Sequence, residues 1–308
     1  EQIFDEDAAH VCSTIEMLDF DLDVDVAVID EVQMLGDDDR GWAWVNAIIG
    51  CPAKKIIMTG SVNALEAVKK ITSYLGEELK VVKHKRKNEL KVLSKHTALD
   101  HLEPATALIA FSRSDVLKLK QKLQKKYSVS VIYGNLSPEV RRDEARRFRE
   151  NETQILIATD AIAMGLNLPI KNILFTTDTK FDGISRRKLV VNEIVQIAGR
   201  AGRYGHFEAG FIGATRRDVL KHIQSEYEKP IKTIKPPFKV KINASQLESL
   251  ASHIKTKSLT KTLKYFAKNM VFSGPFIASN ISSMLEASTI VDNKKDLKLE
   301  DKYLLAQA

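Results

Sequence analysis

Short apolar runs that recur along the chain constrain its fold more than any other feature. Several are apolar at nearly every position instead of alternating with polar residues, a pattern typical of strands buried on both faces of a parallel sheet. Stretches with helical periodicity separate the runs, so the sequence predicts an α/β fold built in layers. The runs lie at residues 26–29, 55–58, 107–111, 130–133, 154–158, 172–176 and 211–214.

The segment 138–149 carries the clearest helix signals. Ser137 is a suitable N-cap, Pro138 stands at the first helical position, and Glu139 lies in the first turn near the positive end of the helix dipole. Its arginines are interspersed with acidic residues, so we expect a solvated face with ion pairs within the helix. A second helix is predicted at residues 115–127.

Two breaks divide the chain. The first is the basic stretch 83–87, which follows a strand-like run at 79–82. We interpret it as an exposed linker, with a nuclear-localisation or RNA-binding patch as the alternative. The second break contains Pro236 and Pro237, after which the periodicity becomes helical. The sequence therefore predicts an α/β piece at residues 1–90, a second α/β domain at 91–215, and a linker with a helical region at 216–308.

Composition narrows the class of partner. The formal net charge is +7 and the sequence pI is about 9.1, which favours a polyanion such as nucleic acid. Cys12 and Cys51 have no metal-site spacing and are expected to be thiols in a reducing compartment. No apolar run reaches the roughly 18 residues that span a bilayer, so we expect no membrane partner. The chain opens at Glu1 without Met or a signal-peptide pattern, and we expect it to be an internal segment.

An apolar run places two carboxylates, Asp30 and Glu31, at its carboxyl end. Ligands bind at that edge of open α/β sheets. An Asp there can hold Mg²⁺ through its waters, and an adjacent Glu can orient or deprotonate an attacking water. The amide of Gln33 could report the nucleotide state to a neighbouring group. A strand end followed by an acidic turn is the alternative interpretation.

Polar residues also follow two predicted strands of the second domain. Ser112 and Arg113 supply a hydroxyl and a cation that suit a backbone phosphate, although Ser112 could simply cap the next helix. Thr159 follows another strand, with Gly165 and Asn167 about one turn later. These residues suit contacts to phosphate and nucleotide, and a capped loop is the alternative.

The stretch QIAGRAGR at residues 196–203 sets Arg200 and Arg203 on one side of a helical turn. A guanidinium is permanently charged and forks onto phosphate oxygens, so the pair suits a polyphosphate. Gly199 and Gly202 cost helix stability unless something must approach the backbone closely. A basic helix end beside its own dipole is the alternative.

In chain order the strings STIEM, DEVQ, MTGS, IAFSR, ATDAIAMGLNLP and QIAGRAGR resemble the motif series of superfamily-two helicases of the DExH type. GWAW after DEVQ, VIYG, and DAIAMGLNL resemble most closely the mitochondrial-degradosome ATP-dependent RNA helicases and their bacterial relatives. The resemblance implies two RecA-like parallel-sheet domains, the first incomplete, followed by a helical C-terminal region. It also implies an RNA helicase that couples ATP hydrolysis to translocation and unwinding.

The resemblance further implies a role for each matched residue. Asp30 would bind Mg²⁺ and Glu31 would activate water, with Gln33 coupling hydrolysis to Gln196. Thr14 matches a position that holds the nucleic-acid backbone. The remaining assignments are arginine fingers for Arg200 and Arg203, backbone contacts for Ser112, Arg113 and Thr159, and proximity to the nucleotide for Gly165 and Asn167.

The implied cofactors are ATP and Mg²⁺, and the implied partners are RNA or another single-stranded nucleic acid and an exoribonuclease. The location would be cytoplasmic in a bacterium or the mitochondrial matrix in an organelle. One feature departs from the family: no Gly is followed by Lys, so the P-loop signature is absent. In the family that loop precedes STIEM, so we expect a truncated chain that alone hydrolyses ATP poorly. A DNA helicase and a non-catalytic nucleic-acid-binding module are the alternatives.

Overall fold

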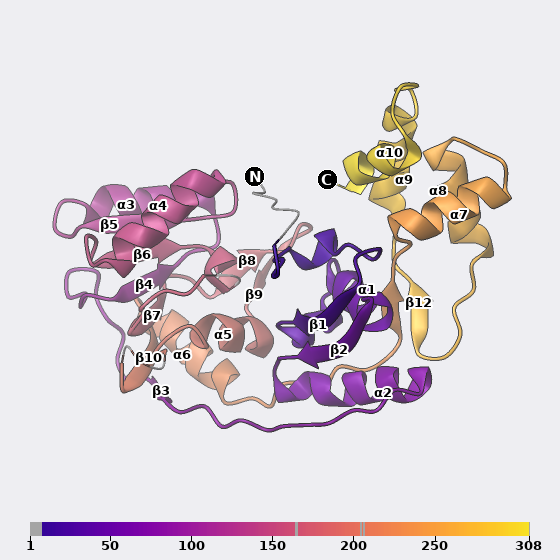
Figure 1. Cartoon of the computed structure of the whole chain (residues 1–308). Helices are drawn as coiled ribbons and strands as arrows, with labels where there is room; N and C mark the ends of the chain where they lie inside the picture. Colours follow the sequence, from indigo (N-terminus) through magenta and orange to yellow (C-terminus); the bar gives the residue numbers. More distant parts are fainter. Residues whose placement is uncertain (1–7, 164–165, 204, 206, 308) are drawn as a thin grey trace. The chain divides into compact units, whose positions relative to one another are not determined.

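The computed structural model describes residues 8–163, 166–203, 205 and 207–307. The chain divides into two compact units, one formed by residues 82–231 and the other by residues preceding 82 together with those following 231 (Figure 1). Each unit is described by itself. The predicted division at residues 90 and 215 stays a prediction.

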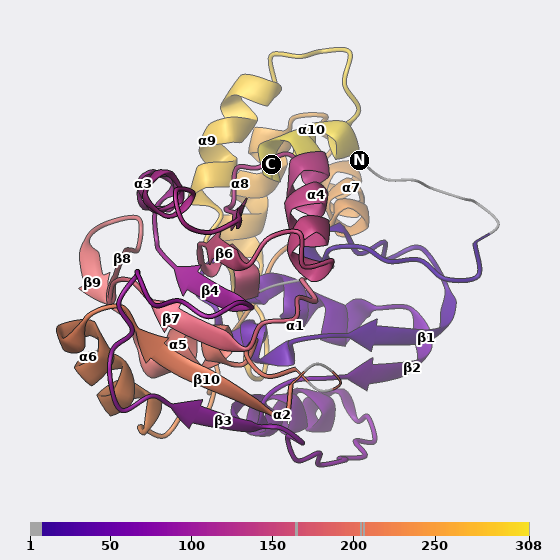
Figure 2. The same ribbon diagram turned by 90° about the vertical axis from the view of Figure 1, so that its left-hand side faces the viewer.

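A six-stranded parallel sheet organises the unit of residues 82–231 (Figure 2). Its strand order is β3-β10-β7-β4-β6-β5. The four strands β4 to β7 are buried at every residue, which is why their sequences are mostly apolar. The strands are β3 (Glu89–Val92), β4 (Thr106–Ile109), β5 (Val129–Ile132), β6 (Ile155–Ala158), β7 (Asn172–Phe175) and β10 (Ala209–Ala214).

Alternate residues of these strands pack into two separate cores, one on each face of the sheet. In β4, Ala107 and Ile109 join the core that α4, α5 and α6 cover, and Leu108 joins the core that α3 covers. This alternation is the side-chain period of a strand. The helices are α3 (Arg113–Leu123), α4 (Pro138–Arg149), α5 (Val191–Ala198) and α6 (Arg217–Tyr227), with a 3₁₀ turn η4 (Asp160–Ala163).

The helix predicted at 138–149 is confirmed. Ser137 Oγ accepts a hydrogen bond from the backbone N–H of Val140, and Pro138 opens the helix. The expected ion pairs are also present, because Arg146 contacts three carboxylates, those of Asp143, Glu150 and Glu152. The helix predicted at 115–127 begins two residues earlier, at Arg113, and ends at Leu123.

The other unit contains a two-stranded parallel sheet of β1 (Val24–Ile29) and β2 (Ala53–Met58). Val26 and Val28 of β1 are 50% and 65% exposed, so one face of this short sheet is uncovered. The other elements before residue 82 are η1 (Ile15–Met17), η2 (Val32–Gly36), α1 (Gly41–Gly50), η3 (Val62–Ala64) and α2 (Leu65–Leu75). The strand-like run at 79–82 forms no strand, so that expectation is wrong.

The C-terminal region is mainly helical, as predicted, and it joins the same unit. Phe238 and Val240 of β11 pack in the core beside α1, and Asn46 of α1 hydrogen-bonds both the N–H and the carbonyl of Lys241. Four helices then form their own core around Leu263. The elements are β11 (Phe238–Val240), α7 (Ala244–His253), α8 (Leu259–Asn269), β12 (Phe276–Ala278), α9 (Ser282–Val291) and α10 (Leu299–Gln307).

Candidate functional site

The two carboxylates predicted at a strand end lie just beyond β1. Glu31 has φ 57°, a left-handed conformation that turns the chain sharply between β1 and η2. Two backbone bonds tie this turn to the end of β2, from Thr59 N–H to the Ile29 carbonyl and from Val32 N–H to the Thr59 carbonyl. The indole N–H of Trp44 donates to the Asp30 carbonyl at 2.8 Å. The turn is therefore fixed from both sides.

Asp30 presents an exposed carboxylate at this edge. Its Oδ1 accepts a hydrogen bond from the backbone N–H of Glu31, at 2.9 Å, and another from the Thr59 hydroxyl. Among the described residues no group of three His, Cys, Asp or Glu could form an all-protein metal site. Mg²⁺ usually takes one or two carboxylates and completes its shell with water and phosphate oxygens. Asp30 therefore fits Mg²⁺ that arrives with a nucleotide.

Gln33 joins the carboxylate of Glu31 to the segment that follows β2. Its amide N–H donates to Glu31 Oε2, and its amide oxygen accepts from the N–H of Ser61 at 3.1 Å. Gly60 makes this approach possible, because a Cβ there would lie 2.8 Å from Gln33 Oε1 and 2.7 Å from Val32 Cγ2. DEVQ and MTGS are thus in direct contact. The amide nitrogen of Gln33 contacts Glu31 within DEVQ, and its amide oxygen contacts Ser61 of MTGS.

Thr14 is exposed at the start of η1. Its carbonyl accepts from the N–H of Met17 at 3.0 Å, so its backbone is part of the 3₁₀ turn. The same turn is held to α1 by an ion pair between Glu16 and Arg40. The hydrogen bond described for Thr14 lies within η1. Its role in binding nucleic acid stays a prediction.

Ser112 and Thr159 share the carboxyl edge of the six-stranded sheet, because β4 and β6 are parallel neighbours. Ser112 does cap α3, since its Oγ accepts from the N–H of Asp115 at 3.0 Å. The guanidinium of Arg113 lies over the ring of Tyr133, 5.7 Å from its centroid. Thr159 is buried, and its Oγ1 accepts from the N–H of Ala161. These side chains lie where a phosphate backbone could cross the edge.

The two arginines predicted to be fingers, Arg200 and Arg203, contact the segment that follows β6. Arg200 donates to the carbonyl of Ala163, and Arg203 donates to the side-chain oxygen of Asn167. Gln196 lies on α5, one turn before Arg200. The structure thus brings the QIAGRAGR stretch together with Asn167. The predicted site residue Gly165 lies outside the described residues.

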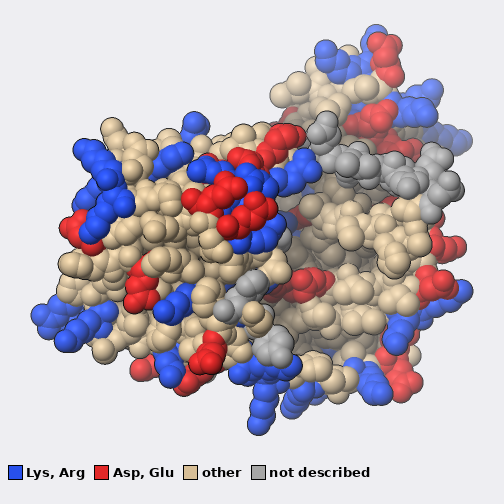
Figure 3. All heavy atoms as spheres, turned by 60° about the vertical axis from the view of Figure 1, so that its left-hand side comes forward, with Lys and Arg blue, Asp and Glu red and all other residues tan. Residues whose placement is uncertain are grey.

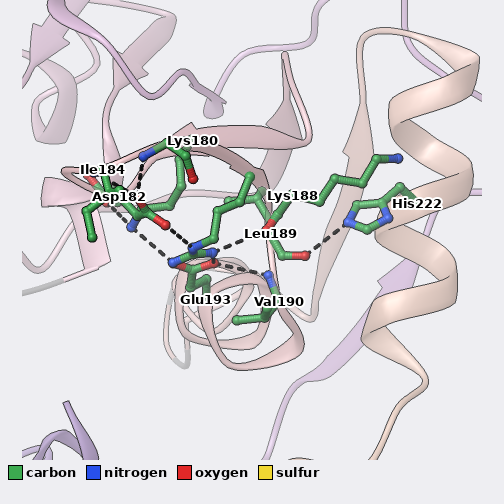
Figure 4. Close-up of polar contacts among 11 residues, drawn as sticks. Lys180, Asp182, Ile184, Lys188, Leu189, Val190, Glu193 and His222 are labelled. Carbon is green, nitrogen blue, oxygen red and sulfur yellow. Dashed lines mark hydrogen bonds and ion pairs between the residues drawn. The ribbon is translucent and has the colours of Figure 1, made fainter. Parts of the chain in front are cut away.

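A hairpin between β7 and α5, in the segment 178–188, makes charged contacts that the sequence did not predict (Figure 4). It consists of β8 (Thr179–Phe181) and β9 (Arg186–Lys188), which pair antiparallel. Arg187 makes two bonds of 2.9 Å to Glu193 on α5, and Lys180 lies 3.1 Å from both Glu193 and Asp160. The hairpin therefore connects η4, which follows β6, to α5, the helix that precedes Arg200 and Arg203. Only the opposite charges of these residues could have suggested the link.

Neighbouring charges set the ionisation of this network. Burial lowers the pKa of Lys180, but Asp160 and Glu193 outweigh it and raise the pKa overall. Burial raises the pKa of Glu193, but hydrogen bonds from Arg187, the Val190 N–H and Lys180 hold that pKa below its usual value. Lys180 and Glu193 are therefore both charged at neutral pH. Acidic and basic side chains also mix on the face drawn in Figure 3, where no single basic area dominates.

The chain resembles known helicases along most of its length. Residues 1–84 match the DEXQ-box helicase domain of Suv3, and residues 88–205 match the helicase conserved C-terminal domain. The mitochondrial ATP-dependent RNA helicase SUV3 of Saccharomyces paradoxus is 34% identical over 96% of this chain and 42% of that protein. The mitochondrial DExH-box ATP-dependent RNA helicase DExH16 of Arabidopsis thaliana is 34% identical over 97% of this chain and 53% of that protein.

One solved structure supports the fold. The Mycobacterium smegmatis helicase Lhr bound to ssDNA and AMP-PNP aligns with a TM-score of 0.51 and 14% identity, over 87% of this chain and 38% of that chain. Among the described residues, no helix is long and apolar enough to cross a membrane. The chain spans about half or less of the length of the curated relatives reported above.

Fold and site together define a class, the helicases with RecA-like α/β domains. Carboxylates follow one parallel strand, and an arginine pair follows a helix packed on a second parallel sheet. Both matching domain families belong to that class. The chain belongs to the superfamily-two helicases, and its first part is a DEXQ-box domain of the Suv3 kind.

Proposed function

We propose that the complete protein is an ATP-dependent RNA helicase that couples ATP hydrolysis to movement along RNA and to its unwinding. The observation that carries the proposal is the fixed DEVQ turn, in which Gln33 contacts both Glu31 and Ser61. A residue that touches the water-activating carboxylate and a second motif can pass the state of the nucleotide to other parts of the protein. The names of the SUV3 relatives support ATP and RNA as the ligands.

Several of the predicted residues have a task in this proposal. Asp30 would hold Mg²⁺, which supplies charge stabilisation for the transferred phosphoryl group when it is bound. Glu31 would accept a proton from the attacking water. Arg200 and Arg203 would neutralise charge that develops on the γ-phosphate. Ser112 and Thr159 support nucleic-acid binding because they lie at one carboxyl edge.

The experiment is RNA-stimulated ATPase turnover of the complete gene product and of its Glu31→Gln variant. The variant keeps the shape of the side chain and removes its charge, so we expect kcat to fall about 10²- to 10⁴-fold while ATP binding is retained. Turnover that is unchanged in the variant would contradict the role of Glu31. The segment 1–308 alone is expected to hydrolyse ATP poorly, because it carries no P-loop signature.

DNA is the competing substrate, since the structural neighbour Lhr is described as bound to ssDNA. Backbone contacts of the kind proposed here do not select the sugar. Unwinding of matched RNA and DNA duplexes with 3′ tails separates the two substrates, and a preference for DNA would overturn the RNA assignment. The affinity for RNA or DNA should fall steeply as the salt concentration rises, and an affinity that does not change with salt would contradict phosphate binding.

A non-catalytic nucleic-acid-binding module is the second alternative, because the sequence contains no Gly-Lys pair. Sequencing the gene upstream of Glu1 decides this point, since an encoded P-loop supports the enzyme. The mitochondrial names of the relatives support the mitochondrial matrix as the location. An exoribonuclease partner is part of the same proposal, and co-purification with the complete protein tests it.

A further inference from the structure

Two side chains, one in the basic stretch 83–87 and one just after it, contact the backbone of the finger loop, which we define as residues 199–203 and 207. Arg86 Nη1 donates to the Gly199 carbonyl at 3.1 Å, and its Nη2 donates to the Ala201 carbonyl. Asn88 Nδ2 donates to the Gly202 carbonyl at 3.0 Å and to the Phe207 carbonyl at 2.6 Å. Residues more than a hundred positions apart in sequence are therefore joined by four hydrogen bonds.

The finger loop needs such donors because α5 ends at Ala198. Carbonyls at and beyond a helix end have no partner within the helix, and a buried carbonyl without a hydrogen bond is costly. Ala201 is completely buried. A guanidinium offers several donors in a rigid plane, so one arginine can satisfy two neighbouring carbonyls, and its charge suits the negative end of a helix.

The opposite side of the finger loop is fixed by close packing. The N–H of Gly202 donates to the Ile170 carbonyl at 2.8 Å. Gly202 has φ 61°, and a Cβ there would lie 2.3 Å from the backbone nitrogen of Gly210 on β10. The backbone around the two finger arginines is thus held between the sheet and the linker.

The hydrogen bonds from Arg86 and Asn88 reach carbonyls directly beside the two finger arginines. The carbonyls that Arg86 contacts belong to Gly199 and Ala201, the residues on each side of Arg200. One of the carbonyls that Asn88 contacts belongs to the residue directly before Arg203. We infer that Arg86 and Asn88 are positioning residues for the arginine fingers, and this inference rests on the proposed ATP hydrolysis.

Loss of Arg86 should slow chemistry more than it weakens binding. A displacement of a catalytic group by about 1 Å can cost roughly 100-fold in rate, so we expect Arg86→Ala to lower the RNA-stimulated kcat about 10- to 100-fold. The KM for ATP and the Kd for RNA should change little. Arg86→Lys keeps the charge but not the planar fork, so its kcat should stay close to that of Arg86→Ala.

A double-mutant cycle in the complete gene product shows whether Arg86 acts through Arg200. If it does, Arg86→Ala should have almost no effect once Arg200→Ala is present, because effects within one functional unit are not additive. Lys85→Ala is the matched control, since it removes one positive charge from the same exposed stretch and should leave kcat unchanged. Thermal melting of each variant checks folding.

The outcomes are distinct. Equal kcat for wild type and Arg86→Ala, or effects that multiply in the cycle, would overturn the inference and leave the proposed function intact. A wild-type protein without RNA-stimulated ATPase would overturn the proposed function and the inference with it. If Arg86→Ala does not fold, the same cycle with Asn88→Ala and Arg203→Ala decides, by the same criterion of coupled or multiplied effects.

Discussion

Gly60 is the position at which a single methyl group should disturb the DEVQ turn. In Gly60→Ala the added Cβ would lie 2.7 Å from Val32 Cγ2, 2.8 Å from Gln33 Oε1 and 3.1 Å from Val32 N. The last of these atoms is backbone that also donates to the Thr59 carbonyl. The side chain of Gln33 can move away, but the backbone of Val32 cannot do so without breaking that bond.

The expected destabilisation follows from these contacts. Forcing a methyl group into a packed site typically costs about 1–3 kcal/mol. Displacing Gln33 also breaks its bond to the Ser61 N–H, worth about 0.5–1.5 kcal/mol. We therefore expect the free energy of unfolding to fall by about 1–4.5 kcal/mol, the lower limit applying if Gln33 finds another partner.

Urea unfolding followed by tryptophan fluorescence is a direct assay, because both tryptophans, Trp42 and Trp44, lie on α1 in the same unit as Gly60. Gly134→Ala is the control, since a Cβ there meets nothing within 4 Å. By circular dichroism it should be neutral or stabilising by up to about 1 kcal/mol. An unfolding midpoint for Gly60→Ala equal to that of wild type would refute the packing argument.

Two further predictions concern pH and a helix cap. Burial lowers the pKa of Lys241 to about 8, with Glu16 opposing, so the unfolded chain binds more protons and stability should rise from about pH 8 to pH 10.5. Unfolding of Lys241→Met at pH 8 and 10 should show a smaller rise than wild type. Asp292 accepts bonds from Ser258 and the first N–H groups of α8, so Asp292→Ala should cost about 0.5–2 kcal/mol in urea unfolding. Burial raises the Asp292 pKa, but these bonds hold it at about 2, so this stability should be lost as pH falls below 3.8, and the variant should lack that loss.

Sequence predicted best what local chemistry determines. The helix at 138–149 was fixed by Ser137 and Pro138, which act within one turn. The buried strands were visible because both faces of β4 to β7 are covered, so most of their residues are apolar. The run at 79–82 has similar side chains but forms no strand, and side-chain type alone does not show whether a neighbouring strand is present.

Contacts between distant segments were not predictable in the same way. DEVQ and MTGS were both visible as strings in the motif series, but only the structure, in which β1 pairs with β2, shows Gln33 beside Ser61. Arg86 was one charge in a basic stretch, and its two carbonyl partners lie more than a hundred residues away. Its contact with these carbonyls depends on the tertiary fold, which no local sequence pattern predicts.

The packing of β11 against α1 has a consequence for the order of folding. The unit that contains DEVQ is interrupted by the whole of residues 82–231, so the ribosome completes that inserted unit before it adds Phe238 and Val240. Domains fold as units during synthesis, with the N-terminal ones usually first. Here the inserted unit is the first whose residues have all been synthesised. The core around Trp44 and Ile48 can be completed only after Phe238 and Val240 have been added. The segment before residue 82 is therefore translated first, but its core is completed last.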